Sequence, residues 1–170
     1  MGRARFKLYP VDYEEMLRTL KERIKYARTR KNKVCLQILL IQLVNGAKIS
    51  DAYRAYYEWL KDPSRRTVSV KVSKYKKPVY RVLTIPVDVI EPINEKVHIV
   101  SVKKLAIRSL GINTHSLRLA YIYYLARKLY LSPEAIAKII KHYNPREIAG
   151  IITVLDKLHQ EKQSGGRQFN

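Results

Sequence analysis

Apolar positions recur at helical spacing in the first third of the chain. The first run has an apolar stripe that includes Leu17, Leu20 and Ile24, and basic residues fill most of its remaining surface. The second run is apolar on nearly every side and stops at Asn45-Gly46, a natural C-terminal break. With a third run capped by a serine, the pattern predicts helices over residues 13–30, 34–44 and 51–61.

The period then changes from that of a helix to that of a strand. Residues 67–73 and 79–85 alternate apolar and polar positions, and the lysine-rich segment 74–78 between them is typical of a hairpin tip. Helical spacing returns after Pro92, and Ser132-Pro133 is a typical helix start. Four further helices are expected, over residues 100–110, 115–130, 133–143 and 145–160.

Three helices, a hairpin and four helices predict one α+β domain that is mostly α, with a small antiparallel sheet. We expect this domain to cover residues 1–162, including a basic lead-in at 1–9, and residues 163–170 to form a disordered tail. With 46% hydrophobic residues, the chain can bury a substantial core. Its single cysteine, Cys35, lies in an apolar run and is expected to be a small buried side chain.

The charge of the chain points to a polyanionic partner. It has 34 Lys and Arg against 14 Asp and Glu, a net charge of +20. Such an excess repels itself in a compact fold, whereas binding to DNA neutralises it and releases condensed counterions. A membrane partner is not expected, because the longest apolar run, residues 38–44, is interrupted by Gln42. The composition therefore predicts binding to nucleic acid, duplex DNA first.

No signal peptide or transit pattern is evident, so we expect a cytoplasmic, nucleoid-associated protein. Many Tyr, Ile and Lys beside few Gln and Cys are typical of a thermophilic source. No pattern predicts a cofactor or a metal site.

His115 and Arg118 form an H-x-x-R motif, and His142 follows the phrase at residues 131–141. These two motifs resemble those of the catalytic domain of tyrosine recombinases, the phage-type integrases, in which an H-x-x-R motif opens a helix and a later histidine follows such a phrase. Upstream, residues 43–51, LVNGAKISD, resemble the family's helix end "tGaRisE". The resemblance covers roughly residues 10–155 and implies the family's catalytic-domain fold without its separate N-terminal domain.

The resemblance also implies a chemistry. In the family, two arginines and the histidines hold the scissile phosphate, and a hairpin lysine protonates the leaving 5′-oxygen. A tyrosine attacks the phosphorus and leaves a 3′-phosphotyrosyl link. The positions that correspond to the phosphate-binding set are Lys48, Lys74, His115, Arg118 and His142.

Two departures from the family's pattern decide the expected function. Lys48 replaces the first arginine and lacks its bidentate fork. The place of the tyrosine, near Ile151 to Thr153, holds no tyrosine, and none follows Tyr143. We therefore expect a catalytically inactive, sequence-tolerant duplex DNA-binding protein derived from a tyrosine recombinase, with an architectural or mobile-element role. The alternative is an active recombinase whose nucleophile is Tyr143 or is supplied by another subunit.

Several other interpretations stay open. The tyrosines near residues 53–57 and 121–124 could stack on single strands or simply pack in the core. Residues 133–160 could be a helix-turn-helix reader, or the chain an unrelated regulator or RNA-binding protein. Exchange of the last helix between subunits would give a homo-oligomer, as in many family members. Contacts with duplex DNA are expected from Arg28, Arg30, Lys31, Lys48, Lys74, Lys76, Lys77, Arg81, His115, Arg118 and His142.

Overall fold

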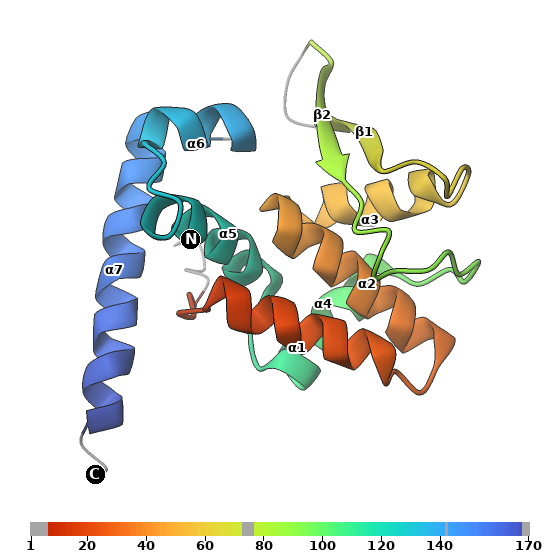
Figure 1. Ribbon diagram of the computed structural model, residues 1–170, viewed down its shortest axis with the longest axis horizontal. Helices are drawn as coiled ribbons and strands as arrows, with labels where there is room; N and C mark the ends of the chain where they lie inside the picture. The colour runs from red at the N-terminus through yellow and green to blue at the C-terminus, as the bar shows by residue number, and fades with distance from the viewer. Residues whose placement is uncertain (1–6, 73–76, 142, 168–170) are drawn as a thin grey trace, which may run out of the picture.

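The computed structural model describes residues 7–72, 77–141 and 143–167 (Figure 1). It confirms the predicted α+β class, mostly α with one two-stranded antiparallel sheet. The elements in chain order are α1 (Tyr13–Lys25), α2 (Arg30–Asn45), α3 (Ile49–Trp59), β1 (Thr67–Val72), β2 (Val79–Thr84), α4 (Ile99–Leu105), the π-helical segment η1 (Ala106–Leu110), α5 (Thr114–Arg127), α6 (Pro133–Ile140) and α7 (Pro145–Arg167).

The first two helices divide at a different place from the one expected. Instead of one helix to residue 30, α1 ends at Lys25 and α2 already begins at Arg30. The Thr29 side chain accepts a hydrogen bond from the backbone N–H of Asn32 at 3.1 Å, which makes it the N-cap of α2. Arg28 therefore lies in the connection between the helices.

Other boundaries move by a few residues. Helix α3 follows Lys48 as its N-cap residue, not Ser50, and α5 is capped by Asn113, whose side chain accepts from the N–H of Ser116 at 2.9 Å. Helix α6 ends at a left-handed residue, Lys141 (φ 63°). Helix α7 continues to Arg167, past its expected end near residue 160 and into the segment expected to be a tail.

Helix α2 is the centre of the main core and contacts α1, α3, α4, α5 and β2. Its residues Ile38, Leu39, Leu40 and Ile41 are all fully buried, and Cys35 is buried as expected. Figure 1 shows α1 running beside α2, with the hairpin and α7 on opposite sides of the molecule. A second, smaller apolar cluster lies between α5, α6 and α7, so α5 joins the two parts.

The hairpin presents one charged residue to the core. Its register pairs Thr67 with Thr84 and Val72 with Val79, and alternate residues are buried. On β2 the buried positions are Arg81 and Leu83. An arginine therefore occupies an inward position that the strand period would assign to an apolar side chain.

Gly46, the residue after α2, brings α2 close to α5. Its φ is +57°, and a Cβ there would lie 2.4 Å from Cδ1 of Tyr121 and 3.0 Å from Cδ1 of Ile140. Only glycine adopts this conformation at low cost while leaving room for the Tyr121 ring. The last carbonyls of α2 thus face side chains of α5 and β2.

Candidate phosphate-binding site

Arg118 lies on the first turns of α5 and is buried, with 4% of its surface exposed. Its Nε donates to the carbonyl oxygen of Gly46 at 3.2 Å, and its Nη1 donates to the hydroxyl of Tyr143 at 3.3 Å. The guanidinium carbon is 4.6 Å from the centre of the Tyr143 ring. Arg118 is therefore held between the end of α2 and the connection from α6 to α7.

Arg81, from β2, lies beside Arg118 and is equally buried, 4% exposed. Its Nη2 donates to the carbonyl oxygen of Asn45, and the Asn45 side chain ties β2 to α2 through both the N–H and the carbonyl of Thr84. Burial, and then the nearby charge of Arg118, lower the pKa of Arg81 to about 10. Burial lowers the pKa of Arg118 as well.

Asp51 is the acidic side chain of this cluster and is 1% exposed. It forms an ion pair with Arg54, and its charge raises the pKa of both Arg81 and Arg118 against the effect of burial. Two buried guanidinium groups thus lie near one buried carboxylate. The cluster keeps an excess of positive charge in a low-dielectric setting, which an anion would relieve.

A cavity of about 300 Å³ opens beside Arg118; we call it the Arg118 cavity. The structure brings Lys48, His115 and Arg118 together on its walls, although the first lies before α3 and the other two on α5. Lys103 of α4 adds a further cation. Burial, and then the charge of Arg118, lower the pKa of His115, so its imidazole favours the neutral form. This composition suits a phosphate group.

A second cavity, of about 410 Å³, adjoins the first at His115; we call it the Tyr143 cavity. His115, Tyr143 and Ile151 all line it. Ile151 is in the region where the family resemblance places the nucleophilic tyrosine, and it packs against the second apolar cluster. The hydroxyl of Thr153 is exposed and donates to the carbonyl of Ala149 within α7. Arg118 instead contacts the phenol of Tyr143.

Other predicted contact residues lie elsewhere. Arg28, in the connection before α2, and Arg30 and Lys31, at the start of α2, are exposed and do not line the Arg118 cavity. Arg30 is 3.8 Å from a carboxylate oxygen of Glu95. Lys77 is exposed just before β2. Lys74, Lys76 and His142 lie outside the described residues.

Sequence reasoning missed three features of the site. It assigned no role to Asp51 or to Lys103, and it did not anticipate that Arg81 is buried. The period of β2 could have revealed Arg81, since it shares a face with Leu83 and Ile85. Nothing in the sequence around Lys103 distinguishes it from Lys104, the other exposed lysine of α4.

The tyrosines of α3 have packing roles. The hydroxyl of Tyr53 donates to the carbonyl of Val97 at 2.6 Å, that of Tyr56 to Ile93 at 3.2 Å and that of Tyr57 to Glu95 at 2.9 Å. These bonds hold the loop before α4 against α3. The hydroxyl contacts support the packing interpretation of these tyrosines over base stacking.

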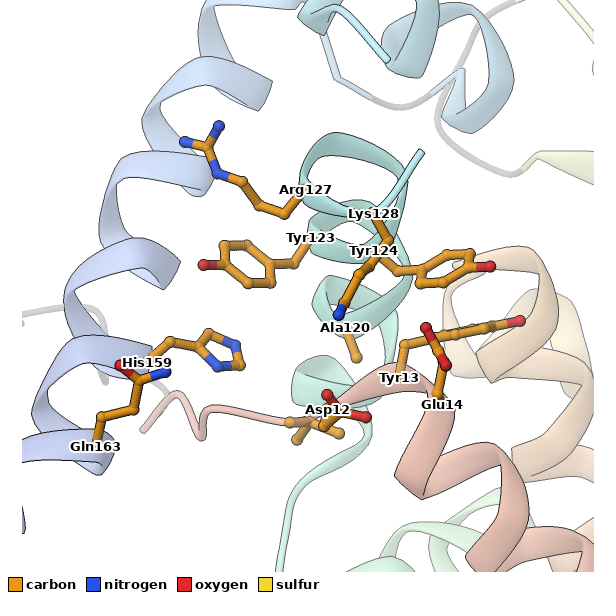
Figure 2. A pocket seen from close by; sticks show the side chains of 11 residues that line it. Asp12, Tyr13, Glu14, Ala120, Tyr123, Tyr124, Arg127, Lys128, His159 and Gln163 are labelled. Atoms are coloured by element: carbon orange, nitrogen blue, oxygen red, sulfur yellow. The ribbon is translucent and has the colours of Figure 1, made fainter. Parts of the chain in front are cut away.

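A third hollow, of about 260 Å³, lies between the start of α1, α5 and α7 (Figure 2). The rings of Tyr13 and Tyr124 stack there at 4.3 Å, and Tyr123 stacks on His159 at the same distance. The carboxylates of Asp12 and Glu14 also line this hollow. Because carboxylates repel phosphates, we do not assign the hollow to DNA.

The described residues contain no group of three or more His, Cys, Asp or Glu side chains that could hold a metal ion. No single helix in the described ranges has the length and apolarity to cross a membrane, and only α2 and α3 taken together, bent by 115°, pass that test.

Comparison with known proteins gives one relative. The chain is 32% identical over 146 residues to a protein of the Acidianus two-tailed virus named "Putative integrase ORF241". The chain is similar to an integrase. The match covers 79% of this chain and 58% of the relative, so the integrase-like chain spans little more than half the relative's length. No family model matches the chain, and no solved structure matches it.

Proposed function

We propose that this integrase-like chain binds duplex DNA through its phosphates, derives from a tyrosine recombinase and does not cut the strand. The observation that supports this most is the Arg118 cavity, where Lys48, His115 and Arg118 converge from separate elements. Such groups bind the backbone and carry little sequence information, so we expect weak sequence preference. An architectural role, on chromosomal DNA or on a mobile element, fits this mode of binding.

The absence of cutting rests on α7. Ile151 and Thr153 occupy the region expected for the nucleophile, one apolar and the other with its hydroxyl donated to the helix backbone. Neither side chain offers a phenol to the phosphorus. The proposal therefore assigns the cavity to phosphate binding alone.

A gel shift on random duplex DNA at several salt concentrations tests the binding. Affinity should fall by about 0.9 log units per log unit of salt for each phosphate neutralised. A nearly flat salt response would contradict the proposal. Single-stranded DNA and RNA of the same length are the comparison ligands, and preferential binding to either would favour the corresponding alternative.

One contact favours a second candidate, an active strand cleaver. The hydroxyl of Tyr143 lies 3.3 Å from Nη1 of Arg118, close to any phosphate that this arginine binds. Attack by that oxygen would form the phosphotyrosyl bond and break the bond to the 5′-oxygen, which would take up a proton.

A nicked suicide substrate separates the two candidates. A covalent adduct on a denaturing gel that disappears in Tyr143→Phe would establish the cleaver. Tyr130→Phe, at an exposed tyrosine outside both cavities, is the matched control. We expect no adduct with any of the three proteins.

A further inference from the structure

Arg81 and Arg118 form a buried cationic pair with unused donors. Nη1 of Arg81 and Nη2 of Arg118 are buried and have no hydrogen-bond partner among the described residues. Leaving a buried charged donor without an acceptor is destabilising, and native proteins rarely do so. Two such atoms on neighbouring side chains indicate a missing acceptor.

The two side chains are bound to the same end of α2. Arg81 donates to the carbonyl of Asn45, and Arg118 donates to the next carbonyl, that of Gly46. The positive charge of Arg118 lowers the pKa of Arg81, which places the two groups within electrostatic reach of one another. Asp51 offers one negative charge against their two, and it is also paired with Arg54. By charge as well as by hydrogen bonding, an anion is missing.

We propose that Arg81 and Arg118 together bind one tetrahedral oxyanion, a phosphate, beside the Arg118 cavity, which Arg118 lines and Arg81 does not. Arg81 supplies the second guanidinium that Lys48 does not, since a guanidinium fork matches two phosphate oxygens and an ammonium is a point charge. The identification of the oxyanion as a DNA phosphate rests on the proposed function. The site itself rests on the two arginines alone.

Tyr143 accounts for the burial of the unused donor of Arg118. Its ring covers the guanidinium of Arg118, and its hydroxyl accepts from Nη1 of that residue. The ring comes from the connection between α6 and α7, after the left-handed residue Lys141, and not from α5. A phosphate oxygen would replace the hydroxyl as the acceptor of Nη1.

The competing explanation is that Arg81 only caps α2 and holds β2. Inorganic phosphate distinguishes the two, because it reports on the site without DNA. Thermal unfolding is measured with rising phosphate against chloride at equal ionic strength, for the wild type, Arg81→Met, Arg81→Lys and the control Arg127→Met. Arg127 lies on α5 about two and a half turns after Arg118. It is exposed and forms an ion pair with Asp156 of α7.

Phosphate should raise the melting temperature of the wild type and of Arg127→Met. In Arg81→Met its apparent affinity should fall about tenfold or more, the loss expected for a charge-assisted pair, with Arg81→Lys in between. If the melting temperature depends on phosphate equally in the wild type and in Arg81→Met, Arg81 only caps the end of α2. If Arg81→Met does not fold, undiminished phosphate affinity in Arg81→Lys overturns the proposal in the same way.

Different results would refute the proposed function and the proposed oxyanion site. A wild type that binds duplex DNA with a steep salt dependence but gains nothing from phosphate refutes the oxyanion site and leaves the proposed function standing. Phosphate stabilisation that depends on Arg81, without any gel shift on duplex DNA, refutes the proposed function and leaves the oxyanion site.

Discussion

Helix α5 carries two arginines in opposite circumstances. Arg127, near its end, is exposed, and its Nη2 is 2.6 Å from a carboxylate oxygen of Asp156 on α7. Arg118, two and a half turns earlier, is buried, and its acceptors are a backbone carbonyl and a phenol. The carboxylate beside Arg127 satisfies its charge, whereas a buried charge with only neutral acceptors lowers stability. This difference is the reason we expect Arg118, and not Arg127, to bind an outside anion.

The two ends of α5 also differ in what holds them. The Arg118 end meets α2 at Gly46, in the main core. The Arg127 end packs against α6 and α7 through the second apolar cluster, and at the surface it adds Asp156 and the stacked rings of Tyr123 and His159. We expect changes at Gly46 or Arg118 to alter folding and DNA binding, and changes to the surface groups near Arg127 to alter stability slightly.

Gly46→Ala should have the largest effect. The new Cβ meets the Tyr121 ring and the residue keeps a positive φ, so we expect the free energy of unfolding to fall by about 2–4 kcal/mol. Urea unfolding followed by tryptophan fluorescence measures it. Gly150→Ala on α7 is the control: its Cβ meets open space, and we expect about 0.5–1 kcal/mol of stabilisation. Similar effects at the two glycines would contradict the close contact of α2 with α5.

Arg118→Met should separate the two arginines by function. Losing a charge-assisted contact with phosphate weakens duplex DNA binding by about thirtyfold, or roughly 2 kcal/mol. Arg127→Met should weaken it less than about threefold, because that charge is already paired. Gel shifts at one salt concentration measure the DNA affinity of both variants, and circular dichroism confirms that they are folded. Equal losses would mean that the Arg118 cavity has no special role.

Asp156→Asn should weaken the contact of α7 with α5 only slightly, by about 0.5 kcal/mol, as expected of an exposed ion pair. The hydrogen bond from Arg127 lowers the pKa of Asp156. The stabilisation is therefore present above the unfolded carboxyl's pKa and disappears as the pH falls through the lowered native pKa. Thermal unfolding at neutral and acidic pH measures this. Asp88→Asn, at an exposed carboxylate, is the control, and an equal change there would refute the pair's contribution.

His115→Gln should show the smallest effect, in the pH dependence of DNA binding. The pKa of His115 is lowered in the free protein, and a bound phosphate would favour its protonated form. Wild-type affinity, measured at constant ionic strength, should therefore rise about two- to threefold relative to the variant as the pH falls from about 8 to about 5. A pH profile identical in the two proteins would remove His115 from the phosphate site.

The sequence predicted the class and order of the elements because their signals are local. Ser132 caps α6 as expected, with its side chain accepting from the N–H of Ala135 at 3.2 Å. The break between α1 and α2 was missed because the residues around Thr29 are good helix formers on both sides, so a single capping threonine decides it. The continuation of α7 to Arg167 was missed because its last residues include two glycines, which usually end a helix.

The meeting of Lys48 with His115 and Arg118 could be expected only from the family resemblance, since the two motifs are far apart in the chain. Whether each of these side chains is buried, and what it contacts, could not be predicted from the sequence. Burial of Arg81 contradicts the usual position of an arginine, and the contact of Tyr143 with Arg118 depends on the left-handed turn at Lys141. Both are decided by packing between elements, which local patterns do not encode.

The acceptors for Arg81 and Arg118 at the end of α2 are backbone atoms, and this bears on how the site can change in evolution. The carbonyl end of a helix has a partial negative charge whatever its side chains are. Substitutions along α2 can alter its packing but cannot delete the Asn45 and Gly46 oxygens that anchor the two guanidinium groups. If the chain derives from a tyrosine recombinase, as we propose, the proposed anion-binding centre could persist after the nucleophile on α7 was lost and lysine replaced arginine at position 48.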